Sequence, residues 1–333
     1  MSRADWSQGG GSAPGRLWSA RLSNPPRPPV VSRFAPAPTG WLHLGHLVNA
    51  LFVWGVTHAL GGRVLLRIED HDRQRCRPAF ERAILDDLDW LGFVPDEPST
   101  DAFRCGACSG RQSDRAATYE AAFTALRQQR LVYGCSCSRA DISGETPSGD
   151  EIRYPGTCRA KGLLDGPGLC VRLRLDSTVE RFDDLLRGPQ EQRPDEQCGD
   201  LIVRDRRGNW SYQFAAAVDD LAQGITTVIR GDDLLGSTGR QILLARLLGR
   251  REPARFLHHP LVMKTPTHKL SKADHDTSIR DMRLNGETPE RLIGQAAALG
   301  GLVEQARPVA ATEAPILMRE RMPALLAHVG GAR

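Results

Sequence analysis

The stretch RFAPAPTGWLHLGH, residues 33–46, joins a short apolar run to a long apolar segment. Its prolines and glycines predict a rigid turn between a strand over residues 30–34 and a helix over residues 44–60. His43 and His46 fall in or beside the first turn of that helix. The order strand, turn, helix predicts the opening of an α/β fold.

The start of this helix is suited to bind an anion. Unpaired amides and the helix dipole attract negative charge there, and Gly45 lets a ligand lie close to the backbone. The site follows the carboxyl end of a strand, where open α/β sheets bind ligands. The stretch therefore predicts a triphosphate site. Two histidines three residues apart are also compatible with half of a metal site, or with two exposed side chains.

Strands and helices alternate outward from this stretch. The expected strands are 63–69, 170–175, 201–204, 226–230 and 256–263, and the expected helices are 78–91, 113–129, 238–248 and 288–299. A further element is expected over residues 210–218, after a turn at 207–209. Alternation with short links is typical of parallel sheets flanked by helices, so the predicted class is α/β with a Rossmann-like catalytic domain.

The domain organisation is predicted from composition. Residues 133–197 are rich in loops, glycine, proline and cysteine and interrupt the alternation, so they are expected to form an inserted subdomain. The predicted division is a disordered tail at 1–28, the first half of the catalytic domain at 29–132, the insertion at 133–197, the second half at 198–275, and a short helical C-terminal region at 276–333.

Composition narrows the function classes. The chain has 333 residues, 40% of them apolar, with no apolar run of the roughly 20 residues that a membrane span needs. No signal-peptide pattern opens the sequence, so a cytoplasmic location is expected. The net charge of +4 permits a nucleic-acid partner without requiring one.

The lysines are few and clustered. Three of the four in the chain, Lys264, Lys269 and Lys272, fall within nine residues, whereas 40 of the 44 basic residues are arginine. Such a cluster indicates a need for compact, mobile ammonium groups, which can stabilise charge on a pyrophosphate leaving group. The alternative is a solvated basic loop.

Together these motifs resemble the class I aminoacyl-tRNA synthetases. HLGH at 43–46 is similar to the first signature of that family, and KLSKA at 269–273 is similar to the second. RFAPAPTGWLHLGH, LLRIEDHD, YQFAAAVDD and VIRGDDLL resemble the glutamate-specific branch, and the resemblance runs from about residue 30 to 300. It implies activation of L-glutamate by ATP with Mg²⁺ to glutamyl-adenylate, followed by acyl transfer to a nucleophile.

The resemblance also implies roles for single residues. The glutamate site would comprise Arg33, Phe34, Ala35, Pro36, Ala37, Glu69, Tyr212 and Arg230, with Glu69 on the ammonium group and Arg230 on the side-chain carboxylate. ATP would contact His43, Gly45, His46 and Lys272, and the catalytic set would be His43, His46, Lys269 and Lys272. For Glu69 and Arg230 the alternative is a structural ion pair. Ala37 and Ala273 depart from the serines that the family usually has.

The length of the chain bears on the acceptor. Only about 60 residues follow Lys272, too few for the anticodon-binding region of a full glutamyl-tRNA synthetase. The sequence is more similar to the truncated glutamyl-queuosine branch, which activates glutamate without tRNA and attaches it to the cyclopentene-diol of queuosine in tRNA(Asp). We expect the protein to be a monomer whose macromolecular partner is tRNA(Asp) bearing queuosine. A truncated enzyme that charges tRNA(Glu) and a non-catalytic, synthetase-like RNA-binding protein are the alternatives.

Cysteines in the insertion resemble the zinc site of that branch. Cys135, Cys137, Tyr154 and Cys158 would hold one structural Zn²⁺ as a tetrahedral set, with free thiols as the alternative. A rival set replaces Tyr154 and Cys158 by the pair Cys105 and Cys108. The three remaining cysteines are expected to be small buried hydrophobes: Cys76, Cys170 and Cys198.

Overall fold

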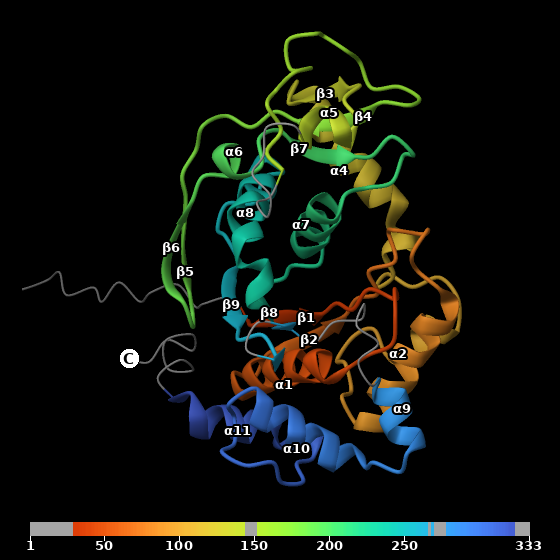
Figure 1. The fold of residues 1–333 in the computed structure, drawn as a ribbon, viewed down its shortest axis with the longest axis vertical. Helices are drawn as coiled ribbons and strands as arrows, with labels where there is room; N and C mark the ends of the chain where they lie inside the picture. The colour runs from red at the N-terminus through yellow and green to blue at the C-terminus, as the bar shows by residue number, and fades with distance from the viewer. Residues whose placement is uncertain (1–28, 144–151, 266–267, 270–277, 324–333) are drawn as a thin grey trace, which may run out of the picture.

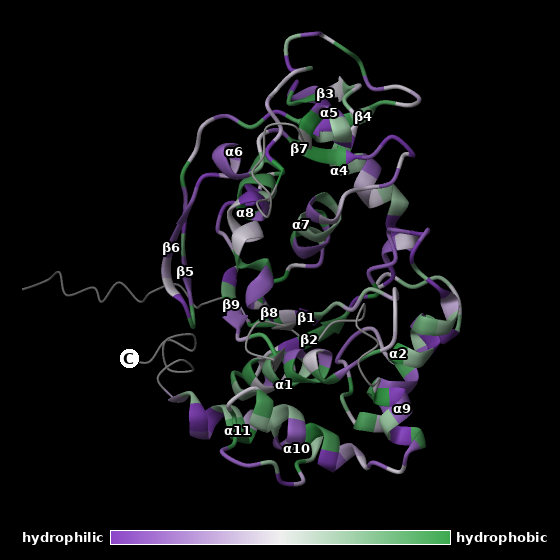
Figure 2. Cartoon of the chain, in the orientation of Figure 1, coloured by the Kyte–Doolittle hydropathy of each residue, from purple (hydrophilic) through white to green (hydrophobic). Residues whose placement is uncertain are grey.

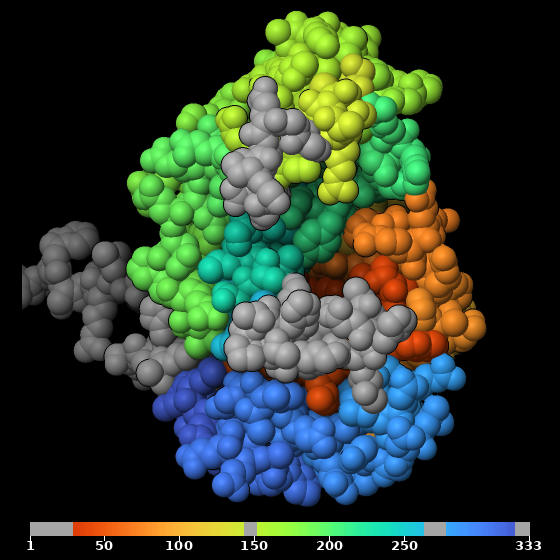
Figure 3. All heavy atoms as spheres, viewed as in Figure 1, coloured from red at the N-terminus to blue at the C-terminus, as the bar shows by residue number. Residues whose placement is uncertain are grey.

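The computed structural model describes residues 29–143, 152–265, 268–269 and 278–323. An α/β core lies in the middle, an antiparallel subdomain at one end, and C-terminal helices at the other (Figures 1 and 3). The predicted tail at 1–28 lies outside the described residues.

Two pairs of parallel strands form the core. β1 (Val31–Phe34) pairs with β2 (Arg63–Leu66), and β8 (Thr227–Gly231) pairs with β9 (Arg255–His259). The amide of Thr226 donates to the first carbonyl of β1 over 2.9 Å, which places the two pairs side by side. The predicted parallel sheet is therefore confirmed.

Alternation along these strands separates the two faces of the sheet. Val64, Leu66 and Leu257 face α1 (Leu44–Ala59), whereas Leu65 and Phe256 belong to a second apolar cluster, which packs against α8 (Thr238–Leu247). α7 (Tyr212–Ala222) lies beside α8, away from α1 (Figure 1). The sheet is thus buried on both faces, which explains its continuous apolar runs (Figure 2).

A hairpin that the sequence analysis missed extends this sheet. β5 (Glu180–Asp184) pairs antiparallel with β6 (Gly188–Gln192) and, at Asp184, parallel with Phe256 of β9. The hairpin falls within the predicted insertion at 133–197, for which one strand was expected. That expectation needs correction, because β6 reads GPQEQ and carries no apolar alternation from which a strand could be predicted.

The subdomain itself is a three-stranded antiparallel sheet. Its order is β3 (Val132–Cys135), β4 (Cys170–Leu173), β7 (Leu201–Arg204). β7 was assigned to the second half of the catalytic domain, yet it pairs with β4. Strand pairing therefore does not follow the predicted boundary at residue 197. The chain between these strands also forms two short helices: α5 (Arg139–Ser143) and α6 (Pro194–Gln197).

The C-terminal helices cover α1. α10 (Pro289–Leu299), capped by Thr288, matches the expected helix over 288–299, whereas α11 (Ala314–Arg321) was not predicted. α11 packs on α1 at Gly55, where an added Cβ would lie 2.6 Å from the Cγ atom of Met318. α1 therefore lies between the sheet and two helices, which explains why it is apolar on every side.

The remaining elements connect these layers. They are α2 (Pro78–Leu91), α3 (Thr100–Arg104), η1 (Gln112–Arg115), α4 (Ala116–Gln128), η2 (Asp232–Ser237), β10 (Met263–Thr265), β11 (His268–Lys269), α9 (Ile279–Leu284) and η4 (Ala311–Glu313). α2 begins and ends where the sequence predicts, since Gly92 adopts the left-handed conformation that stops a helix (φ +79°). Within the described part of the chain, no helix has the length and apolar character to cross a membrane.

Asp87 of α2 provides a test of this packing. The side chain is 3% exposed, and burial raises its pKa to about 7 against the opposing charges of Arg283 and Arg280 on α9. Because the folded state holds this proton above the unfolded pKa of 3.8, stability should fall as pH rises from about 4 to 7. Asp87→Asn should therefore be more stable than the wild type in urea at about pH 8, with the difference vanishing toward pH 4.

The exposed Asp101→Asn is the control, because its carboxylate is 85% exposed. An equal effect of Asp87→Asn at both pH values would contradict a raised pKa at this position.

Candidate active site and metal cluster

The two signature histidines cap α1. His43 is the N-cap residue, and its Nδ1 accepts the N–H of Gly45 over 3.1 Å, while the backbone N–H of His43 donates to Nδ1 of His46 over 3.2 Å. An acceptor role at Nδ1 leaves the proton of each neutral ring on Nε2, and such a donor suits a phosphate oxygen. Helix capping is thus a fourth explanation of the histidine pair, which the sequence analysis did not weigh.

Gly45 is required by this arrangement. A Cβ at that position would lie 2.9 Å from Cε1 of His43, so any side chain there would displace the ring. The close approach that the sequence assigned to a ligand is made, in the structure, by the imidazole of the neighbouring cap residue.

The histidines open onto a pocket at the carboxyl ends of β8 and β9. It is lined by His43, Gly45, His46, Asn49, Gly231, Asp233, Leu234, His259, Leu261 and Val262. The pocket therefore has the predicted position at a strand end. Lys264 and Lys269 lie on β10 and β11, whereas Lys272 and Ala273 lie outside the described residues.

Charged residues follow the apolar ones on the sheet face toward α7 and α8. On each of three strands, a polar residue lies two positions after an apolar one and therefore on the same face. The pairs are Val31 and Arg33 on β1, Val228 and Arg230 on β8, and Phe256 and His258 on β9. All three of these polar residues are at most 5% exposed. The carboxyl ends of the strands thus bring buried charges together next to the histidine pocket.

Asp220 of α7 pairs with two buried arginines, Arg33 and Arg67. Its Oδ1 accepts from Nε of Arg33 over 3.0 Å and from Arg67, whose guanidinium is fully buried. Although burial alone would raise its pKa, the two arginines lower the pKa of Asp220 to about 2. Asp219 beside it accepts from Arg115 and Tyr119 and ties α7 to α4.

Glu69 lies beside the same arginines. Its Oε1 is 3.6 Å from NH1 of Arg67, so an ion pair is present, as the structural alternative proposed. Burial nevertheless raises the pKa of Glu69, and Arg67 and Arg33 compensate only in part. A carboxylate in this state would gain from a further cation.

Arg230 differs from the other buried arginines. It donates to His258, Gln241 and Thr238 over 2.7–2.9 Å and to a backbone carbonyl, and all of these acceptors are uncharged. Among the described residues no carboxylate forms an ion pair with it, so the structural alternative does not hold for this residue. Burial lowers its pKa, and Tyr212, half-buried beside it, has a pKa raised by burial and by Glu69.

The segment 34–37 contributes backbone more than side chains. Phe34 is 1% exposed and packs on Trp54, so its side chain belongs to the core beside α1. The carbonyl of Pro36 accepts the N–H of Glu69 over 3.1 Å, which fixes Glu69 against the turn. Ala35 and Ala37 are half-buried in the same turn.

Three cysteines of the subdomain form a cluster. The Sγ atoms of Cys135, Cys137 and Cys158 lie within 4.8 Å of one another, and the hydroxyl of Tyr154 is 3.4 Å from Cys135 and 4.0 Å from Cys137. Arg172 donates to Sγ of Cys135 over 3.3 Å. Thiolates around a tetrahedral zinc ion lie about 3.8 Å apart, so the predicted set fits such an ion.

The rival cysteine pair is elsewhere. Cys108 is buried in the core cluster around α1, Cys105 is exposed, and neither joins the group of possible ligands in the described part of the chain. Cys170 and Cys198 are buried, as expected. Cys76 is half-buried, with its Sγ 3.8 Å from the carbonyl of Glu69.

Comparison with known proteins decides the family. Residues 29–321 match the family model described as tRNA synthetases class I (E and Q), catalytic domain. The chain belongs to this family.

Curated relatives carry one name. The chain is 41% identical over 293 residues to a glutamyl-Q tRNA(Asp) synthetase of Ralstonia nicotianae, covering 85% of each chain. It is 39% identical to proteins of the same name from Symbiobacterium thermophilum and Rhodobacter capsulatus, covering 88% and 80% of this chain and 94% and 100% of theirs.

A solved relative shares the fold. A glutamate tRNA ligase from Elizabethkingia meningosepticum, crystallised in complex with its amino acid, superposes with a TM-score of 0.71 at 26% identity. The match covers 86% of this chain and 64% of that protein, so the chain spans less than two thirds of its length.

The sequence analysis missed several residues of this buried polar network. Arg67, Asp220, Thr238, Gln241 and His258 were not singled out, although Arg67 and Asp220 stand inside the quoted motifs LLRIEDHD and YQFAAAVDD. Their signal is charge within an apolar strand or helix, which predicts a buried partner of opposite charge.

Asp220 yields a test of the ion network. Asp220→Asn would leave Arg33 and Arg67 without their shared anion, so the free energy of unfolding should fall by about 3–5 kcal/mol at neutral pH. Because the pKa of Asp220 is lowered from 3.8 to about 2, this stabilisation is present above pH 4 and is lost as pH falls toward 2. Urea unfolding of both proteins at several pH values measures it.

Asp176→Asn removes the carboxylate of an exposed pair with Arg159 and is the matched control. It should change stability by less than about 1 kcal/mol. A similarly small effect for Asp220→Asn would contradict the network described above.

Proposed function

We propose that the chain activates L-glutamate with ATP and transfers it to queuosine in tRNA(Asp). The family match and the names of relatives that the chain covers almost end to end support this activity. The observation that carries the choice of amino acid is Arg230, a buried cation whose described contacts are all uncharged. An acidic side chain supplies the charge that this residue lacks.

Buried and half-buried residues next to the histidine pocket would complement glutamate at both ends. The side-chain carboxylate would bind Arg230 and Tyr212, and the ammonium group would bind Glu69, whose burial-raised pKa would fall on pairing. Neutral glutamine would leave the buried cation uncompensated, which costs more than a lost contact. Arg33 and the backbone of residues 34–37 would complete the site.

ATP would bind where α1 begins. The helix start, Gly45 and the Nε2 groups of His43 and His46 would hold the phosphates, with Mg²⁺ and with Lys269 and Lys272 of the second signature. The glutamate α-carboxylate then attacks the α-phosphorus, and pyrophosphate leaves as glutamyl-adenylate forms. A queuosine hydroxyl attacks the acyl carbon, and AMP leaves. The residues here act by position and charge.

Glutamate-dependent ATP–pyrophosphate exchange without tRNA tests this proposal. We expect exchange with glutamate and little with glutamine or aspartate. Arg230→Met should raise the KM for glutamate by about 100-fold or more, because a charge-assisted contact at a buried site is lost. The exposed Arg181→Met is the control for loss of an arginine.

The other outcomes identify the alternatives. Exchange that requires tRNA(Glu) would indicate a truncated enzyme that charges this tRNA. No exchange under either condition would indicate the non-catalytic, RNA-binding paralogue.

We further propose that Cys135, Cys137, Cys158 and Tyr154 hold one structural Zn²⁺. The distances among their sulfur and oxygen atoms support this ligand set. The purified protein should contain about one zinc per chain, and Cys137→Ser should lower both the zinc content and the melting temperature, because metal binding contributes to folding.

Cys105→Ser is the matched control and should retain the metal. Full zinc content in Cys137→Ser, or loss in Cys105→Ser, would contradict the proposed ligand set.

A further inference from the structure

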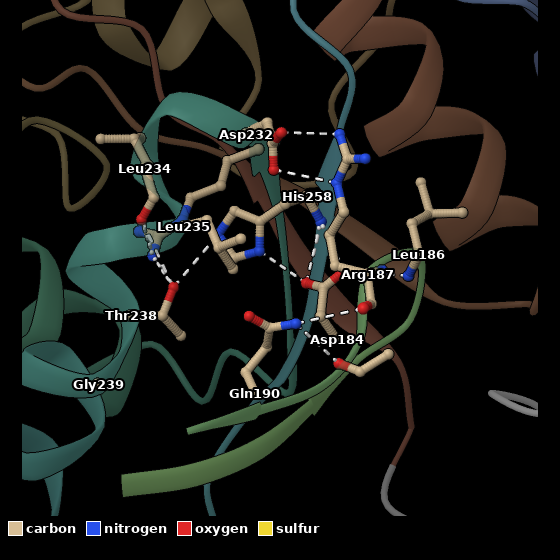
Figure 4. A network of polar contacts seen from close by, with 12 residues as sticks. Asp184, Leu186, Arg187, Gln190, Asp232, Leu234, Leu235, Thr238, Gly239 and His258 are labelled. Carbon is tan, nitrogen blue, oxygen red and sulfur yellow. Dashed lines mark hydrogen bonds and ion pairs between the residues drawn. The ribbon is translucent and has the colours of Figure 1, made fainter. Parts of the chain in front are cut away.

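His258 links the buried Arg230 to a carboxylate on the missed hairpin. It lies on β9 directly opposite Arg230 on β8. Its Nε2 is 2.9 Å from Nε of Arg230, and its Nδ1 is 2.6 Å from Oδ2 of Asp184 on β5. Figure 4 shows Asp184, His258 and Thr238 in one connected network. The side chains of His258 and Asp184 are completely buried.

The neighbours of His258 determine which of its ring nitrogens carries the proton. Guanidinium nitrogens only donate, so Nε2 of His258 must accept from Arg230. A neutral imidazole that accepts at Nε2 carries its proton on Nδ1, where Asp184 accepts it. Burial lowers the pKa of His258, which favours the neutral ring. The ring therefore has one tautomer compatible with both neighbours.

Asp184 is itself held by four donors. Its Oδ1 accepts the backbone N–H groups of Leu186 and Arg187 over 3.0 and 2.8 Å. Its Oδ2 accepts the backbone and ring N–H groups of His258 over 3.1 and 2.6 Å. Although burial opposes ionisation, these bonds lower the pKa of Asp184. The carboxylate stays charged, and an imidazole ring separates it from the guanidinium.

The other contacts of Arg230 preserve this separation. Thr238, Gln241 and the carbonyl of Leu234 accept three more of its five N–H groups, and none of these acceptors carries charge. A carboxylate in place of His258 would pair with Arg230 directly and would compete with an anionic ligand. A neutral ring fixes the guanidinium without neutralising it.

We propose that His258 and Asp184 are positioning residues that orient Arg230 as an uncompensated cation for an acidic substrate side chain. Asp184 fixes the tautomer of His258, and His258 fixes the plane of the guanidinium through Nε. This inference rests on the proposed binding of glutamate by Arg230. It assigns a specificity role to β5, which no motif of the sequence marks.

Two substitutions of His258 separate the functions of its nitrogens. His258→Gln places an amide near the position of Nε2, so its oxygen can accept from Arg230. His258→Asn places an amide near Nδ1, which keeps a donor for Asp184 and leaves Arg230 without this acceptor. In exchange assays, His258→Asn should raise the KM for glutamate by about tenfold or more, with the KM for ATP unchanged. His258→Gln should stay within about threefold.

Asp184→Asn should resemble His258→Asn. The amide oxygen of the new asparagine would still accept the two backbone N–H groups, so its NH2 group would donate toward Nδ1 of His258. The ring proton would then have to lie on Nε2, where it would face the N–H of Arg230. His58→Asn is the matched control, because His58 also pairs with an aspartate, Asp96, over 2.8 Å but lies at the far end of α1. It should leave both KM values unchanged.

A merely structural role would give a different pattern. Equal losses in His258→Asn and His258→Gln that follow their melting temperatures, or an equal rise in both KM values, would overturn the proposal. Nitrogen-15 spectra of the wild type give a readout independent of activity: we expect a protonated Nδ1 and an unprotonated Nε2 at His258. The opposite tautomer or a doubly protonated ring would also overturn it. If the wild type shows no ATP–pyrophosphate exchange, the proposed function fails. The tautomer of His258 in the nitrogen-15 spectra then still tests the hydrogen-bond network on its own.

Discussion

Burial of several guanidinium groups on one face of the parallel sheet is the constraint on which the rest of the structure depends. Such charges are costly in an apolar interior unless a partner meets them, and Asp220 meets two, Arg33 and Arg67. This places α7 over the carboxyl ends of β1 and β2. Arg230 alone among these three is left to uncharged acceptors. The packing that stabilises the fold therefore also sets the charge of the site.

The elements that the sequence predicted well are those that carry their own boundary signals. α2 has proline at its start and a left-handed glycine, Gly92, after its end, and α1 follows the turn in RFAPAPTGWLHLGH. β5 and β6 lack such signals, and α11 has only the proline at its start, Pro315, with no glycine directly after its end. Their strands and helix form because neighbouring elements supply partners, and such tertiary information is absent from local periodicity. For β5 that partner is Phe256, over seventy residues away.

The candidate site divides in the same way. Residues inside recognisable motifs, such as His43 and Glu69, could be named from the chain alone. His258 and Asp184 could not, because a histidine and an aspartate distant in sequence become meaningful only through a shared hydrogen bond. The cysteine cluster is intermediate. Spacing and family resemblance indicated Cys135, Cys137, Tyr154 and Cys158, and the coordinates group the three cysteines of this set without the rival pair.

The hairpin β5–β6 limits how the subdomain can be exchanged between proteins. In the sequence, the hairpin lies inside the cysteine-bearing insertion. A chimera with junctions at residues 133 and 197 would therefore replace the hairpin together with the cysteine cluster. By strand pairing, however, β5 belongs to the sheet beneath Arg230. A graft that retains the amino-acid pocket must rejoin the host chain before residue 180. The subdomain is therefore not one continuous segment of the chain, because β7, which completes its sheet, follows the hairpin that belongs to the other sheet.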